Sequence, residues 1–198
     1  MHQRLWAGRR VLARVAVWLA VAALCLGVAG PRVSAADPPL EHKVKAACLF
    51  NFAVNTEWPA DAFAGPQAPL VVGLIGEVPF APLFERGVQN KTAQGRKLEV
   101  RRLEPGAQAD GCHVVFMASA EEARLEAILA TTAAKPMLTV SEVEGFAQRG
   151  GIINFIKVEG SVKFEVNTDA AARAGLKLGS QLLKLAVIVK DGSKAKPD

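Results

Sequence analysis

Apolar and polar positions alternate along the chain with two different periods, and these periods predict both helices and strands. The stretch at residues 45–59, KAACLFNFAVNTEWP, places apolar side chains at helical spacing. This pattern predicts an amphipathic helix that ends at Trp58 and Pro59, because the residue before a proline is pushed out of the α region. We expect the remainder of the domain to be built against this helix.

Several later segments have the length and pattern of strands. Residues 112–117 are continuously apolar, which is typical of a central strand buried on both faces, whereas residues 97–103 alternate as a strand near a sheet edge does. A tight turn at Glu159 and Gly160 predicts a hairpin whose second strand, 162–166, turns its Lys and Glu side chains outward. The predicted strands are residues 70–75, 97–103, 112–117, 137–140, 152–158 and 162–166.

Helical segments separate these strands. Ser119 and Ser141 are each followed by a glutamate three residues later, which is the spacing of a capping box at a helix start. Asn167 or Thr168 is expected to cap another short helix. After the first helix, a second helix is predicted to begin near Pro79. Four more helices are predicted, at residues 119–130, 141–150, 168–174 and 180–189. This order of elements predicts one α/β domain, with a mixed central sheet of about six strands and helices on both faces.

The first 36 residues have the composition of a secretory leader. Four arginines precede an uncharged, mostly apolar run of 16 residues at 15–30, and small residues follow up to Ala36. The run is shorter than the ~20 residues that a membrane-spanning helix needs, so we expect a cleaved signal peptide rather than an uncleaved anchor. The predicted organisation is therefore a signal peptide at 1–36, an α/β domain at 37–190 and a polar tail at 191–198.

Removal of this leader balances the charge of the remaining chain. The sequence has 24 basic and 19 acidic side chains, and residues 1–36 hold five of the basic ones, so 19 of each remain. A domain without a basic excess lacks the electrostatic attraction to phosphates on which nucleic-acid binding depends. Beyond the leader the cysteines are Cys48 and Cys112, which either pair in an oxidising compartment or stay as buried thiols.

Polar side chains in apolar surroundings, with their aromatic neighbours, are the candidates for partner or ligand contacts. The aromatic residues of the first helix are expected in the core, or else one edge of that helix meets a partner. The two asparagines of the hairpin region either bond to backbone groups at strand ends and caps, or line a groove beside an aromatic ring. The candidate contacts are Asn51, Glu57, Trp58, Asn154, Phe155 and Asn167.

The sequence offers no catalytic or metal-binding motif in the predicted domain. Its histidines, His42 and His113, stand outside any HxxxH or HExxH pattern, and no Gly-x-Ser-x-Gly elbow is present. Cys112 and His113 are adjacent, so in a strand they point to opposite faces and cannot act on the same atom. We therefore expect no cofactor, no metal and no enzymatic activity.

An ordered set of motifs across residues 41–189 resembles the YfiR-like family of bacterial periplasmic proteins. The motifs begin with the helix KAACLFNFAVNTEWP at residues 45–59, and they are specific as an ordered set. The others are Gly76 to Phe80, GCHVVF at 111–116, GGIINF at 150–155, FEVN at 164–167 and residues 170–185.

This resemblance implies a compact α/β domain that acts as a non-enzymatic regulator in the periplasm and tends to dimerise. Its partner would be the periplasmic region of an inner-membrane signalling protein, such as a diguanylate cyclase of cyclic-di-GMP signalling or a sensor kinase. The alternative is a periplasmic small-ligand receptor without a dedicated cyclase partner. Many relatives carry a first-strand cysteine that pairs with the one matching Cys112, but Gly73 stands at that place here.

Overall fold

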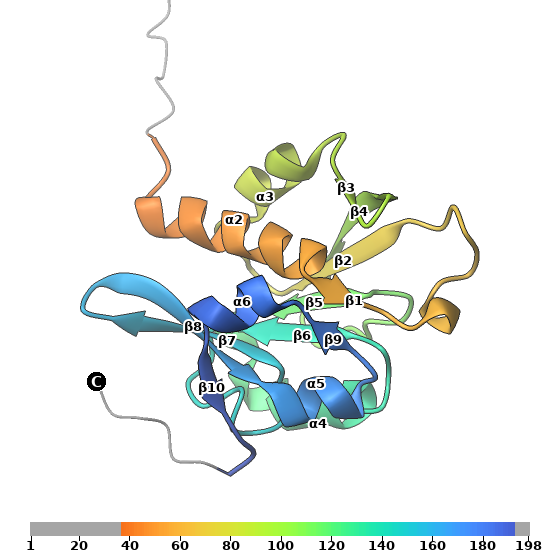
Figure 1. Cartoon of the computed structure of the whole chain (residues 1–198). Coiled ribbons are helices and arrows are strands. Elements are labelled where there is room, and N and C mark those ends of the chain that lie inside the picture. The colour runs from red at the N-terminus through yellow and green to blue at the C-terminus, as the bar shows by residue number, and fades with distance from the viewer. Residues whose placement is uncertain (1–36, 193–198) are drawn as a thin grey trace, which may run out of the picture. The chain divides into compact units, whose positions relative to one another are not determined.

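An eight-stranded mixed sheet forms the centre of the part of the chain that the computed structural model describes, residues 37–192 (Figure 1). Its strands are β2 (Leu70–Ile75), β3 (Thr92–Ala93), β4 (Arg96–Leu103), β5 (Val114–Met117), β6 (Leu138–Ser141), β7 (Ile153–Val158), β8 (Ser161–Asn167) and β10 (Val187–Val189). They lie in the order β10-β8-β7-β6-β5-β2-β4-β3. The predicted α/β class is confirmed, and the sheet is wider than the expected six strands because β3 and β10 extend its two edges.

The pairing directions make the sheet mixed, as predicted. The five strands β4, β2, β5, β6 and β7 run parallel to one another. On either side of them, β8 is antiparallel to β7 and β3 is antiparallel to β4. β10 lies parallel to β8 at the far edge. β5 is buried along its whole length between β2 and β6, which confirms the prediction of a central strand at this position.

Helices cover both faces of the sheet. The helices are α2 (Leu40–Val54), α3 (Ala81–Val88), α4 (Leu125–Thr132), α5 (Thr168–Arg173) and α6 (Ser180–Leu185). Alternate side chains of β2 point into two different hydrophobic cores, one on each face of the sheet. Val72 packs in the core that contains α2 and α3, whereas Val71 packs in the core that contains α4. Figure 1 shows α2 and α3 side by side over the same face of the sheet. None of the helices in the described residues is long and apolar enough to cross a membrane.

The first predicted helix ends earlier than the proline rule indicated. α2 stops at Val54, and the Asn55 side chain and backbone N–H groups both donate to the carbonyl oxygen of Asn51 at 2.9 Å. Thr56 and Glu57 then form β1 (Thr56–Glu57), which pairs antiparallel with β9 (Lys177–Leu178). The helix therefore ends because the chain enters this small two-stranded sheet, not because of the proline.

Three predictions for the second half of the chain are wrong. Residues 142–150 form successive turns rather than a helix, and the hydroxyl of Ser141 donates to the carbonyl of Met117 at 2.9 Å. Ser119 begins a 3-10 helix, Ser119–Arg124, but does not cap it, since its hydroxyl donates to Glu142 at 3.4 Å. The helix predicted at 119–130 is otherwise present, as this segment followed by α4. The predicted last helix, 180–189, ends at Leu185, after which the chain pairs with β8 as a strand.

The predicted leader, residues 1–36, lies outside the described residues, as do residues 193–198 of the predicted tail. The hairpin turn is confirmed, with both Glu159 and Gly160 at positive φ between β7 and β8. One feature of this hairpin differs from the prediction, because Glu165 is buried and not outward-facing.

Candidate functional site

A groove of about 460 Å³ lies between α2 and α3. Its walls are mainly apolar, and Asn51 of α2, a predicted contact residue, lies on its rim with an exposed side chain. Two lysines also line the groove, and the Lys91 ammonium lies 4.6 Å from the centroid of the Phe50 ring. The apolar walls are formed by Ala46, Ala47 and Phe50 of α2 and by Leu83, Gly87 and Val88 of α3.

Trp58 is a core residue, as the simpler of the two sequence interpretations expected. Its side chain is only 9 % exposed, and its indole N–H donates to the carbonyl oxygen of His113 at 3.2 Å. Glu57, the preceding residue, is exposed on β1 opposite Lys177. The predicted group of Asn51, Glu57 and Trp58 is therefore divided, with two exposed side chains on the surface and one inside.

His113 organises the amino end of β5. Val71 N–H donates to its Nδ1 at 3.1 Å, so Nε2 carries the proton of the neutral ring and donates to the carbonyl of Ala62, also at 3.1 Å. The ring stacks on Phe63 with 4.3 Å between centroids. Burial lowers the pKa of His113, because the charged imidazolium is disfavoured away from water. Through these two hydrogen bonds, His113 holds the segment between α2 and β2 against the amino end of β5.

Asn154 and Asn167 are fully buried, so neither lines an open groove. Asn167 caps α5, as predicted, because its Oδ1 accepts from Ala170 N–H at 2.9 Å, while its amide donates to the carbonyl of Ala147 at 2.7 Å. The amide of Asn154 donates to Glu165 at 3.4 Å.

Glu165 belongs to a buried polar cluster that the sequence interpretation missed. Its Oε2 accepts hydrogen bonds from the side-chain amides of Gln148 at 3.1 Å and of Asn154 at 3.4 Å. The segment 142–150 covers this part of the sheet, so a strand position that alternation assigned to solvent is only 5 % exposed. Alternation alone does not show that a loop from elsewhere in the sequence lies over the outer face of a strand.

Phe155, the remaining predicted contact, packs against Phe52 in the core and borders a polar cleft of about 310 Å³. This cleft lies at the carboxyl ends of β5 and β6, which is where open α/β sheets bind ligands. Ser119 and Glu142, which follow these two strands, both line it. The cleft was not predicted, since its side chains come from segments far apart in the sequence.

A chain of four alternating charges runs along this cleft. Lys45 lies 2.7 Å from Glu41 and 2.6 Å from Glu142, and Lys157 lies 2.8 Å from Glu41. Hydrogen bonds from Lys157 and Lys45 lower the pKa of Glu41 to about 2. Burial disfavours the Lys45 ammonium, but its hydrogen bonds to Glu142 and Glu41 outweigh that effect and raise its pKa. Only the Glu41–Lys45 spacing, one helical turn, was visible in the sequence.

Cys48 and Cys112 are both free thiols in the structure. Burial raises the pKa of each thiol, which keeps both in their unreactive protonated form. Gly73 lies directly beside Cys112, since a Cβ built at Gly73 would be 2.9 Å from the Cys112 sulfur and 3.6 Å from its Cβ. Within the described residues, no three side chains of the His, Cys, Asp or Glu type come together in a way that could hold a metal ion.

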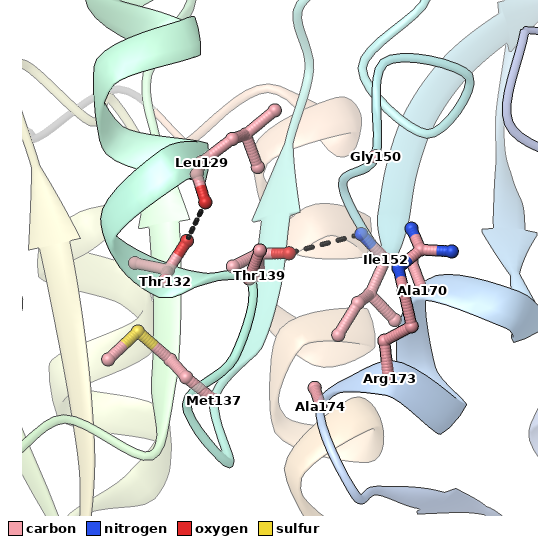
Figure 2. Close-up of a pocket in the computed structure, with 10 residues that line it drawn as sticks. Leu129, Thr132, Met137, Thr139, Gly150, Ile152, Ala170, Arg173 and Ala174 are labelled. Atoms are coloured by element: carbon pink, nitrogen blue, oxygen red, sulfur yellow. Dashed lines mark hydrogen bonds between the residues drawn. The ribbon is translucent and has the colours of Figure 1, made fainter.

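A small pocket between α4 and α5 is part of the packing and not a ligand site. Its volume is about 10 Å³, which is room for at most one water molecule. Figure 2 shows that its polar groups bond within the fold, because Thr139 Oγ1 accepts from Ile152 N–H at 3.0 Å and Thr132 Oγ1 donates to the Leu129 carbonyl at 3.3 Å. The groove and the polar cleft are therefore the stronger candidates for function.

A family model described as YfiR/HmsC-like matches residues 42–187, which is well over half of the sequence. The match includes most of α2 and the whole segment from β1 to α6. It therefore takes in the whole groove and all of the cleft except Glu41.

Proposed function

Because the chain belongs to the YfiR/HmsC-like family, we propose that it is a non-enzymatic periplasmic regulator of a membrane-anchored signalling protein. It binds the periplasmic region of that protein, a diguanylate cyclase of cyclic-di-GMP signalling or a sensor kinase, and restrains its activity. The family match is the observation that carries the proposal. Residues 1–36 act as a cleaved signal peptide in this account, so that the domain works outside the inner membrane.

Exposed apolar side chains on the domain support a function that depends on contact. Leu40 and Val54 of α2 are 75 % and 37 % exposed, and Leu185, at the end of α6, is 76 % exposed. Large apolar side chains in water mark protein-binding surfaces when they gather in patches. A regulator that acts by binding needs such surfaces, whereas a reaction would need converging reactive groups.

The proposed homodimer has a candidate interface at β10. This strand lies at the end of the sheet order, and Val187 and Ile188 are 44 % and 49 % exposed. Two copies could pair their β10 edges antiparallel and so continue the sheet. Light scattering of the wild-type protein and of Ile188→Lys tests this, with a dimer expected for the former and a monomer for the latter; a dimer in both would exclude this edge.

Measurement of cyclic-di-GMP in cells tests the proposed function. Deletion of the gene is expected to raise cyclic-di-GMP severalfold if the partner is a cyclase, and only while that cyclase retains its periplasmic region. A tagged copy should co-purify with an inner-membrane signalling protein. Unchanged cyclic-di-GMP, together with no such protein in the purified material, would contradict the proposal.

The second candidate function is a small-ligand receptor, which the polar cleft favours. The four alternating charges and the adjacent Phe155 suit a small polar molecule that carries both signs of charge. A thermal-shift screen of metabolites tests this, and Glu142→Gln should abolish any shift that it finds. Trp58 fluorescence is a poor reporter here, because Trp58 contacts the amino end of β5 and the cleft lies at its carboxyl end.

A further inference from the structure

The outer face of α2 carries an apolar stripe that faces away from the sheet. Leu40, Ala47 and Val54 are spaced seven residues apart, so they lie on one side of the helix, and all three are exposed. The buried residues of α2, Leu49 among them, lie on the opposite side. A surface helix normally keeps its outer face polar, so exposed apolar residues that share this face are a candidate contact for another protein.

The groove beside this stripe has two helical walls, α2 and α3, against which one face of another helix would pack. Ala47 belongs to both the stripe and the groove, and Gly87 of α3 is exposed in the opposite wall. A Cβ added to Gly87 would meet no atom within 4 Å, and its φ is not in the left-handed region, so this chain's own packing does not require a glycine there. Glycine in a helix is unfavourable, but it permits the close approach of another backbone.

The positive charge of the groove favours an occupant with acidic side chains. Among the described residues, Lys43 and Lys91 are the charged side chains that line it. Two copies that met groove to groove would bring four lysines together, which opposes self-association at this face. Residues 1–36 of the chain hold five arginines and no acidic residue, so they also fail to complement it.

We propose that the groove between α2 and α3 binds an amphipathic helix of the membrane signalling partner, and that an acidic side chain of this helix meets Lys91. This inference rests on the proposed function and names the element that the regulator recognises. The partner helix lies along the stripe formed by Leu40, Ala47 and Val54, with its backbone close to Gly87. The apolar stripe supplies the contact area, and the ion pair with Lys91 fixes the orientation of the partner helix.

Two matched substitutions test the groove. Ala47 and Ala127 are both exposed helical alanines, but Ala127 lies on α4, away from the groove. The protein expressed from the full sequence is titrated with purified periplasmic regions of the inner-membrane signalling proteins that co-purify with it. We expect Ala47→Glu to weaken binding by tenfold or more and Ala127→Glu to change it by less than about twofold. Both variants should keep the unfolding temperature of the wild type.

A charge exchange tests the chemistry of the occupant. Lys91→Glu should weaken binding, Lys91→Arg should preserve it, and an acidic-to-lysine change in the partner helix should restore binding to Lys91→Glu. Hydrogen exchange on the partner should protect one helical segment with acidic residues.

The outcomes separate this inference from the proposed function. If the wild-type protein binds none of the periplasmic regions, both the proposed function and the groove proposal are wrong. If the wild type binds and all variants bind equally well, or if the protected segment of the partner is a strand or a loop, the groove proposal alone is wrong. Dissociation of a homodimer by Ala47→Glu, without loss of the partner, would assign the groove to a second copy and also overturn it.

Discussion

At the scale of single residues, His113 has the clearest structural role. Its two ring nitrogens have opposite roles, with Nδ1 accepting from Val71 N–H and Nε2 donating to the Ala62 carbonyl. Only the neutral ring with its proton on Nε2 satisfies both partners, since protonation of Nδ1 would place a second donor against the Val71 N–H. The same residue accepts the indole hydrogen bond of Trp58 through its carbonyl oxygen.

His113 should therefore make the fold less stable at mildly acidic pH. Its pKa is lower in the folded state than the ordinary 6.5, so the unfolded chain binds the proton more readily, and stability falls as pH drops below about 6.5. Urea unfolding at pH 7.5 and 5.5 measures this difference. His113→Gln should be less stable at both pH values by roughly 1–3 kcal/mol and should lose most of the pH dependence. An equal pH dependence in wild type and variant would contradict this role.

Gly73 offers a second test at the same scale. The 3.6 Å between its ideal Cβ and that of Cys112 lies within the range of disulfide bonds, although the Leu103 side chain at 3.0 Å must move. We expect Gly73→Cys to form a bond with Cys112 and to stabilise the oxidised protein by about 2–4 kcal/mol. Thiol titration and thermal unfolding with and without reductant measure this. If Cys48, Cys112 and the introduced cysteine all still titrate as free thiols after oxidation, the strands are placed differently.

At the scale of elements, α2 connects several parts of the fold. Its buried face packs on the sheet through Leu49 and Phe52, and its first turn joins the β7–β8 hairpin through the Glu41–Lys157 ion pair. Lys45 extends this connection to Glu142, which follows β6.

The ion pairs of α2 should contribute a second, more acidic pH dependence. The Glu41 pKa of about 2 is lower than its ordinary 4.5, so its contribution is complete above pH 4.5 and is lost as pH falls toward 2. Because Glu41 and Lys157 are partly exposed, the effect is screened by salt and should be about 0.5–1 kcal/mol. Glu41→Gln should remove this part of the acid unfolding profile. Identical profiles for both proteins would show that the pairs do not stabilise the fold.

Gly87 allows the stability of α3 to be separated from its proposed role in binding. Since a Cβ at this position meets nothing within 4 Å, Gly87→Ala should stabilise the fold by about 0.5–1 kcal/mol through helix propensity alone. Thermal unfolding measures this gain. A loss of stability would mean that the glycine is needed inside the domain, which would remove one argument for a partner at the groove.

Several elements were predictable because their patterns are local. The continuous apolar run at 112–117 and the turn at Glu159 and Gly160 required no knowledge of the rest of the fold. The errors arise where distant segments meet. Pairing of Thr56 with Leu178 ends α2 early, pairing of Val187 with Glu165 turns an apolar segment into β10, and the loop over β8 buries Glu165.

The candidate site was predictable only in part, for the same reason. Asn51 lies on the rim of the groove and Phe155 borders the cleft, whereas Asn154, Asn167 and Trp58 are inside the domain. The cleft depends on ion pairs such as Lys45–Glu142, whose partners are 97 positions apart in the sequence. Patterns within short windows do not reveal such pairs.

At the scale of the whole molecule, the described residues form one α/β domain, and we propose that this domain works by binding. The family match extends over both faces of the sheet, the groove on α2 and the cleft at the strand ends except for Glu41. Beyond residue 36 the sequence has equal numbers of acidic and basic side chains, so the proposed recognition of a partner would depend on local surfaces and not on net charge.

The most direct measurement is the activity of the membrane partner with the regulator bound. The co-purified signalling protein is reconstituted in liposomes with its periplasmic region outward, and its output, cyclic-di-GMP synthesis for a cyclase, is measured as this protein is added. The account predicts that output falls to a low plateau at saturation, and that it does not fall with a partner lacking its periplasmic region. Output that stays constant while binding is saturated would contradict the central claim.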